Sequence, residues 1–115
     1  PTGEAPGLAR RFLAGLYREW GVEDDHAGRV VVSELVTNAY QHGAGSIVVR
    51  VYRDRCDGEA VIEVWDEGPG LPILGTADGN ATSGRGLMLM SGLVQGWGTR
   101  PVEGGGKIVW GRVLL

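Results

Sequence analysis

Residues 30–43 (VVVSELVTNAYQHG) carry the pattern of a helix buried in the centre of a domain. Apolar residues recur around almost the whole helix and not on one stripe, which is typical of a helix with neighbours on several sides. Glu34 and Asn38 stand four residues apart within it and therefore lie on the same face. Burying a charge without a partner is costly. A ligand, a metal or a solvated cleft is therefore expected beside these two side chains.

Two further helices are predicted around this central one. Amphipathic spacing predicts a helix over residues 6–20, with its charged residues on the side away from the apolar ones. Asp24 or Asp25 can cap the central helix, which we expect to end at Gly43. A short apolar helix is expected over residues 86–95, after a glycine-rich turn.

Four strands are predicted after the central helix. β-branched runs at 46–53 and 60–66 are separated by a short polar loop, which favours an antiparallel hairpin. Residues 96–100 and 107–114 read as two more strands joined by a turn. Hairpin pairs with helices between them predict an α+β fold. We expect a two-layer α/β sandwich in one domain over residues 1–115, with a mixed or antiparallel sheet covered on one face by about three helices.

The composition excludes several classes of protein. The apolar fraction of 43% and the charged fraction of 22% are those of an ordinary globular domain. A formal net charge of −3 argues against a nucleic-acid-binding surface. No apolar run approaches the roughly 18 residues that cross a membrane, and Cys56 is the single cysteine, which excludes an internal disulfide. We therefore expect a cytoplasmic protein without direct contact with nucleic acid or membrane.

Glycine is unusually frequent, at 21 of 115 residues, and the second predicted strand runs out into a glycine-rich loop. Residues 67–85 show no periodicity, and loops of this length are usually functional lids or disordered segments. Asp66 stands at the strand end, where a carboxylate can accept hydrogen bonds from the amine of an aminopurine. Gly68 and Gly70 let the backbone pass close to a flat ring. The same residues would also make a plain turn.

A third stretch, Gly84-Arg85-Gly86-Leu87, precedes the predicted short helix. Backbone N–H groups at the start of a helix bind anions, and glycines let a phosphate approach them. Arg85 adds a positive charge that could serve the phosphates or only cap the loop. The stretch is not a Walker A loop, because no Gly-Lys-Ser/Thr follows it.

Together the three stretches resemble the N box, G1 box and G2 box of the GHKL (Bergerat-fold) ATPases. Residues 33–39 (SELVTNA), with the His-Gly pair that ends the helix, are most similar to the anti-sigma-factor serine/threonine kinases, which carry a histidine-kinase-like ATPase domain. Residues 64–72 resemble the G1 box and residues 84–87 the G2 box. The resemblance covers residues 8–113.

The resemblance implies a role for each residue of the N box. Glu34 would be the general base that activates a serine hydroxyl of a protein, or a water molecule in idle turnover. Asn38 would bind Mg²⁺ beside the nucleotide. His42 matches a position at the end of the N box that is often His, and a structural role at the helix end is an equal alternative.

The resemblance also implies an ATP site. Asp66 would bind the adenine amine, and Gly68 and Gly70 would shape the adenine slot. The residues implied on the phosphate side are Gly84, Arg85, Gly86 and Leu87. ATP and Mg²⁺ are the implied cofactors.

The function implied by the resemblance is that of a regulatory serine/threonine kinase. It would phosphorylate an anti-anti-sigma (STAS-type) partner and sequester a sigma factor, with homodimerisation left open. Two other interpretations stay open. One is an ATP-binding interaction module without phosphotransfer. The other is the excised catalytic domain of a histidine kinase, although His26 and His42 do not stand in the context of a phospho-accepting histidine.

Overall fold

The computed structural model describes residues 3–68 and 92–115. Two helices come first along the chain, α1 (Ala5–Glu19) and α2 (His26–His42). Neither of these two is long and apolar enough to cross a membrane. The strands are β1 (Ile47–Asp54), β2 (Glu59–Asp66), β3 (Gly96–Pro101) and β4 (Lys107–Leu114). Each of these elements lies within a residue or two of the predicted helix or strand, and the central helix begins at His26, directly after the two predicted cap residues.

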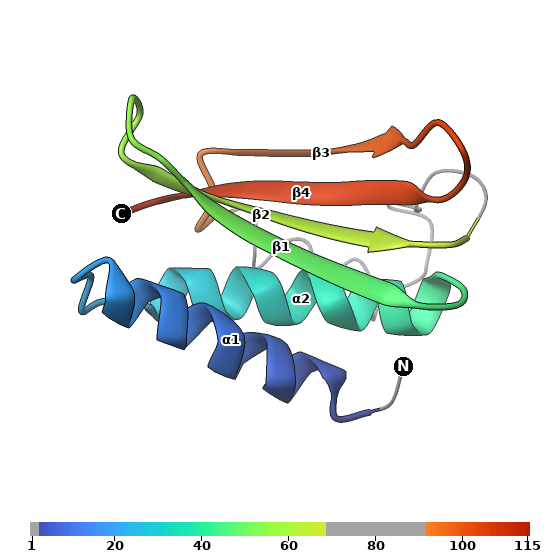
Figure 1. The fold of residues 1–115 in the computed structure, drawn as a ribbon, viewed down its shortest axis with the longest axis horizontal. Helices are drawn as coiled ribbons and strands as arrows, with labels where there is room; N and C mark the ends of the chain where they lie inside the picture. Colours follow the sequence, from blue (N-terminus) through green and yellow to red (C-terminus); the bar gives the residue numbers. More distant parts are fainter. Residues whose placement is uncertain (1–2, 69–91) are drawn as a thin grey trace.

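The four strands form one antiparallel sheet in the order β1-β2-β4-β3. Both helices lie on one face of this sheet, with α2 next to the strands and α1 beside α2 (Figure 1). The predicted α+β two-layer sandwich is therefore confirmed. Of the two sheet types that the sequence allowed, the described strands show the antiparallel one.

The predicted helix over residues 86–95 does not reach Gln95. Residues 92 and 93 form a turn and residues 94 and 95 are not helical either, and the Gln95 N–H donates to the Arg112 carbonyl oxygen at 2.7 Å. The backbone at Gln95 thus already pairs with β4, and Gly92 has low helix propensity. Residues 86–91 lie outside the described residues, so the described helices are two and not about three.

The core lies between the helices and the sheet. β-branched side chains of α2 pack against the inward side chains of β2 and β4. Leu13 and Tyr17 of α1 are buried in the same core. The fully buried residues with the largest side chains include Tyr17, Leu13, Leu35, Ile62, Val31, Val32, Val36, Val64, Val109 and Val113. Packing of this kind holds α2 helical despite its three consecutive valines, which have lower helix propensity than leucine or alanine.

Two aspartates share the start of α2. The Asp24 carboxylate accepts a hydrogen bond from the His26 N–H at 3.1 Å. Asp25 occupies the N-cap position, but its carboxylate pairs with Arg29 Nε at 2.9 Å, one turn into the helix. Asp25 is therefore the N-cap residue by position, as one of the two predicted candidates, but it makes no side-chain capping hydrogen bond.

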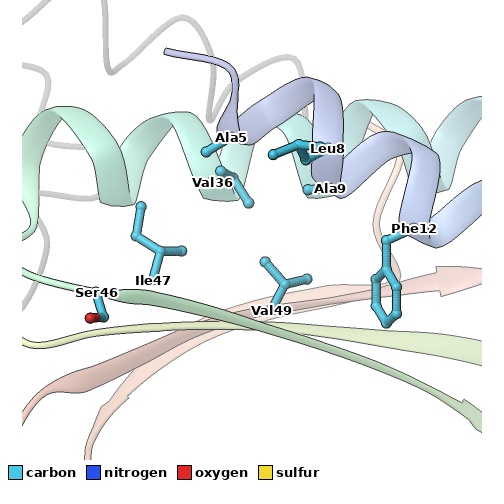
Figure 2. A pocket seen from close by; sticks show the side chains of 8 residues that line it. All are labelled: Ala5, Leu8, Ala9, Phe12, Val36, Ser46, Ile47 and Val49. Carbon is cyan, nitrogen blue, oxygen red and sulfur yellow. The ribbon is translucent and has the colours of Figure 1, made fainter. Parts of the chain in front are cut away.

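An apolar groove of about 500 Å³ lies between α1 and β1 (Figure 2). It is lined by Ala5, Leu8, Ala9, Phe12, Val36, Ser46, Ile47 and Val49. None of the predicted site residues lines it. The groove is therefore separate from the candidate site.

Candidate functional site

The candidate site centres on Asp66, the last residue of β2, whose side chain is 1% exposed. Its Oδ1 accepts three hydrogen bonds: from Lys107 Nζ at 2.9 Å, from the Gly68 N–H at 2.7 Å and from the Ala44 N–H at 3.4 Å. Among described residues, Oδ2 accepts none. A buried carboxylate needs such partners to remain charged at low cost. Oδ2 is thus the atom of this carboxylate that is left for a ligand.

The loop after α2 is fastened to the residues around Asp66. The Glu67 N–H donates to the Ala44 carbonyl oxygen at 2.9 Å, and Glu67 Oε2 accepts from the Ser46 N–H at 2.7 Å. Gly43 lies directly against the carboxylate, since a β-carbon there would stand 2.6 Å from Asp66 Cγ. The C-terminal end of α2 is thereby held beside the end of β2, as the neighbouring ends in Figure 1 also show.

Glu34 and Asn38 share one flank of α2. Ser33, on the flank toward α1, accepts a hydrogen bond from Arg10 Nη1 at 2.7 Å. At 3.6 residues per turn, Glu34 and Asn38 fall on the other flank. Glu34 is half-buried and Asn38 is 8% exposed, and neither makes a hydrogen bond or ion pair with the rest of the described chain. Two polar groups therefore stand unpaired, among described residues, on one side of a buried helix.

The remaining predicted residues divide into two groups. His42 is the last residue of α2 and is exposed, directly before the loop that contacts Asp66. Gly68 donates its N–H to Asp66, and a β-carbon there would stand 2.8 Å from Oδ1. The other predicted positions lie outside the described residues: Gly70, Gly84, Arg85, Gly86 and Leu87. The structure thus brings together the first and second predicted stretches and leaves the third untested.

The donor atoms fit a nucleotide with a divalent cation. No group of three His, Cys, Asp or Glu side chains in the described ranges could by itself hold a metal ion. A cation at Asn38 would therefore take most of its ligands from phosphate oxygens and water, which is how Mg²⁺ is usually held in nucleotide sites. Asp66 offers the amine of a base an acceptor. The binding roles of Asn38 and Asp66 stay predictions.

The sequence-based prediction of the site did not include two residues that contact the Asp66 carboxylate. These are Lys107 and Gly43. The sequence predicts Lys107 only as the first residue of the strand over residues 107–114. A signal for it exists, because Lys107 falls in phase with Val109, Gly111 and Val113, which face the helices. A lysine at an inward position of a strand indicates a buried charge partner.

Comparison with known proteins agrees with this geometry. A family model described as the histidine kinase-like ATPase domain matches residues 2–112. No curated protein matches the sequence. The match covers both described ranges, from α1 to most of β4.

Proposed function

Because the chain belongs to the family of histidine kinase-like ATPase domains, we propose that it is an ATP- and Mg²⁺-dependent protein serine kinase that acts as an anti-sigma factor. Its substrate would be a serine of an anti-anti-sigma protein of the STAS type, and its regulatory target a sigma factor. ATP binding is the general property of the family, and the serine specificity and the two partners are the proposed part.

The observation that carries the proposal is the joining of Asp66 to the end of α2. Through Gly43 and Ala44, the helix with Glu34 and Asn38 is fixed relative to the carboxylate of β2. A nucleotide whose adenine amine binds Asp66 would extend its phosphates along α2. Such fixed positioning is the main contribution that a protein makes to phosphoryl transfer.

The proposed chemistry assigns one task to each polar group of α2. Asn38 would offer its amide oxygen to Mg²⁺, which when bound neutralises charge on the phosphates. Glu34 would accept the proton of the seryl hydroxyl while the seryl oxygen bonds to the γ-phosphorus and the bond to the oxygen of ADP breaks. Glu34 fits this task because no described residue forms an ion pair with it.

Titration of the purified protein with Mg-ATP, followed by two variants, tests the roles on α2. Asn38→Ala should lower the Mg²⁺-dependent affinity for ATP at least about tenfold, since a ligand of the ion is lost. Glu34→Gln should leave the affinity unchanged and lower turnover about 10²–10⁴-fold, the usual contribution of a general base. Glu23→Gln, an exposed carboxylate before α2, is the control. Unchanged Mg-ATP affinity in Asn38→Ala would refute its role.

Incubation with γ-labelled ATP and a STAS-type protein tests the substrate class. The proposal expects label on a serine of the partner, and its loss in Glu34→Gln. Tight ATP binding without any labelled serine would instead identify an ATP-dependent binding module. Label on a histidine of an added helical domain would identify a histidine kinase.

A further inference from the structure

Lys107 is a buried cation whose hydrogen-bonding capacity is only partly used. It opens β4 directly opposite Asp66 in the β2–β4 register, and its side chain is 5% exposed. An ammonium group has three N–H donors. Within the described ranges only Asp66 accepts from it, at 2.9 Å. Donors left unpaired in a buried position are costly, so a further acceptor is expected at this place.

A purely structural ion pair explains the arrangement less well. The Asp66 carboxylate already accepts two backbone N–H groups, from Gly68 and Ala44, on the same oxygen that Lys107 contacts. Replacing a buried ion pair with apolar residues is often neutral or stabilising, so stability alone gives little reason for burying a lysine. The pair does, however, place an unused acceptor, Asp66 Oδ2, beside unused donors on Lys107.

An adjacent acceptor and donor match the edge of a 6-aminopurine. Adenine presents the amine at C6 as a donor and N1 as an acceptor. A 6-oxopurine presents the reverse, a carbonyl oxygen and an N1–H. We infer that Lys107 is a base-specificity residue, which donates a hydrogen bond to N1 of adenine while Asp66 accepts from the amine. This inference rests on the proposed nucleotide site and adds the group that recognises N1.

The charges of Asp66 and Lys107 should favour a 6-aminopurine over a 6-oxopurine. A carboxylate opposite the carbonyl oxygen of a 6-oxopurine leaves two acceptors facing each other, and an ammonium opposite N1–H leaves two donors. A site whose buried polar groups are left unpaired rejects the wrong ligand strongly. Inosine triphosphate, which differs from ATP in this edge alone, should therefore bind at least about a hundredfold more weakly than ATP.

The experiment compares ATP with 1-deaza-ATP, in which a C–H replaces N1 and the amine is kept. Wild-type protein should bind 1-deaza-ATP about ten- to a hundredfold more weakly, the range for a lost hydrogen bond to a charged donor. In Lys107→Met the two ligands should bind alike, since the donor is gone. Lys107→Arg should retain part of the difference.

Arg100→Met is the control, because Arg100 of β3 also forms an ion pair with a carboxylate of β2, that of Glu63 at 2.8 Å, and does not contact Asp66. It should keep the wild-type ratio of the two affinities. Equal binding of ATP and 1-deaza-ATP by the wild type would overturn the inference without any variant, as would an unchanged ratio in Lys107→Met. Failure of the wild type to bind ATP at all would instead refute the nucleotide site itself, and with it this inference.

Discussion

Replacing Gly43 with alanine tests the contact that joins α2 to Asp66. A β-carbon at residue 43 would lie 2.6 Å from Asp66 Cγ, 2.7 Å from Oδ1 and 2.6 Å from the Ala39 carbonyl oxygen. Ordinary van der Waals contacts of a β-carbon are 3.4–4 Å. The backbone of Gly43 is extended, with φ −93° and ψ −163°, so alanine meets no strain from its own dihedral angles. The effect should be steric.

The free energy of unfolding should fall by about 1–2 kcal/mol in Gly43→Ala. Overpacking at a tight contact costs about 1–3 kcal/mol. Alanine recovers about 0.4–1 kcal/mol of this, because it lowers the conformational entropy of the unfolded chain. Gly15→Ala is the control: Gly15 lies within α1 with open space around its β-carbon position, so alanine should stabilise by about 0.5–1 kcal/mol.

Urea unfolding measures the stability change, and a Mg-ATP titration measures the effect on the site. The displaced carboxylate should weaken ATP binding about tenfold, the effect of a misplaced hydrogen-bond acceptor worth about 1.4 kcal/mol. Gly15→Ala should leave the affinity unchanged. If Gly43→Ala were as stable as the wild type and bound ATP equally well, the loop after α2 would not position Asp66.

Two further predictions concern buried polar groups. Burial raises the pKa of Tyr17 to about 12, so the tyrosine of the unfolded chain ionises first as the pH rises above 10. Between pH 9 and 11 the free energy of unfolding of the wild type should therefore fall by about 1 kcal/mol more than that of Tyr17→Phe, as measured by urea unfolding. Parallel pH profiles of the two proteins would contradict this. Asp66→Asn leaves the Lys107 ammonium buried without its charge partner and should cost about 3–5 kcal/mol. The double variant with Lys107→Met should recover a part of that loss, whereas simple addition of the two single effects would show that the pair is not coupled.

The elements of this fold could be predicted because their signals are local. Apolar spacing in α1 and α2 and the β-branched run of β1 each lie within a few consecutive residues. The contact between Asp66 and Lys107 joins positions 41 residues apart and depends on the strand register. The alternation along residues 107–113 indicates that Lys107 faces the core, but spacing along the chain gives no measure of the register that makes Asp66 its partner.

In the candidate site, too, the local relations could be predicted and the relations between distant segments could not. Glu34 and Asn38 share a face by helical period alone, and the structure keeps them on one flank of α2. The closeness of Gly43 to Asp66 depends instead on how the helix layer sits on the sheet. The end of the predicted helix over residues 86–95 was wrong because pairing of Gln95 with β4 overrides the local apolar pattern.

The register that places Asp66 opposite Lys107 also determines how a bound nucleotide would affect the folded population. Both residues lie on central strands, whose pairing closes a long stretch of chain and is lost only when the sheet comes apart. A ligand that contacts residues of both strands binds only the folded chain. At a ligand concentration of 100 Kd it raises the free energy of unfolding by about 2.7 kcal/mol. Amide hydrogen exchange should therefore slow along the whole of β2 and β4, as far as the Glu59–Leu114 pair at the opposite end of the two strands.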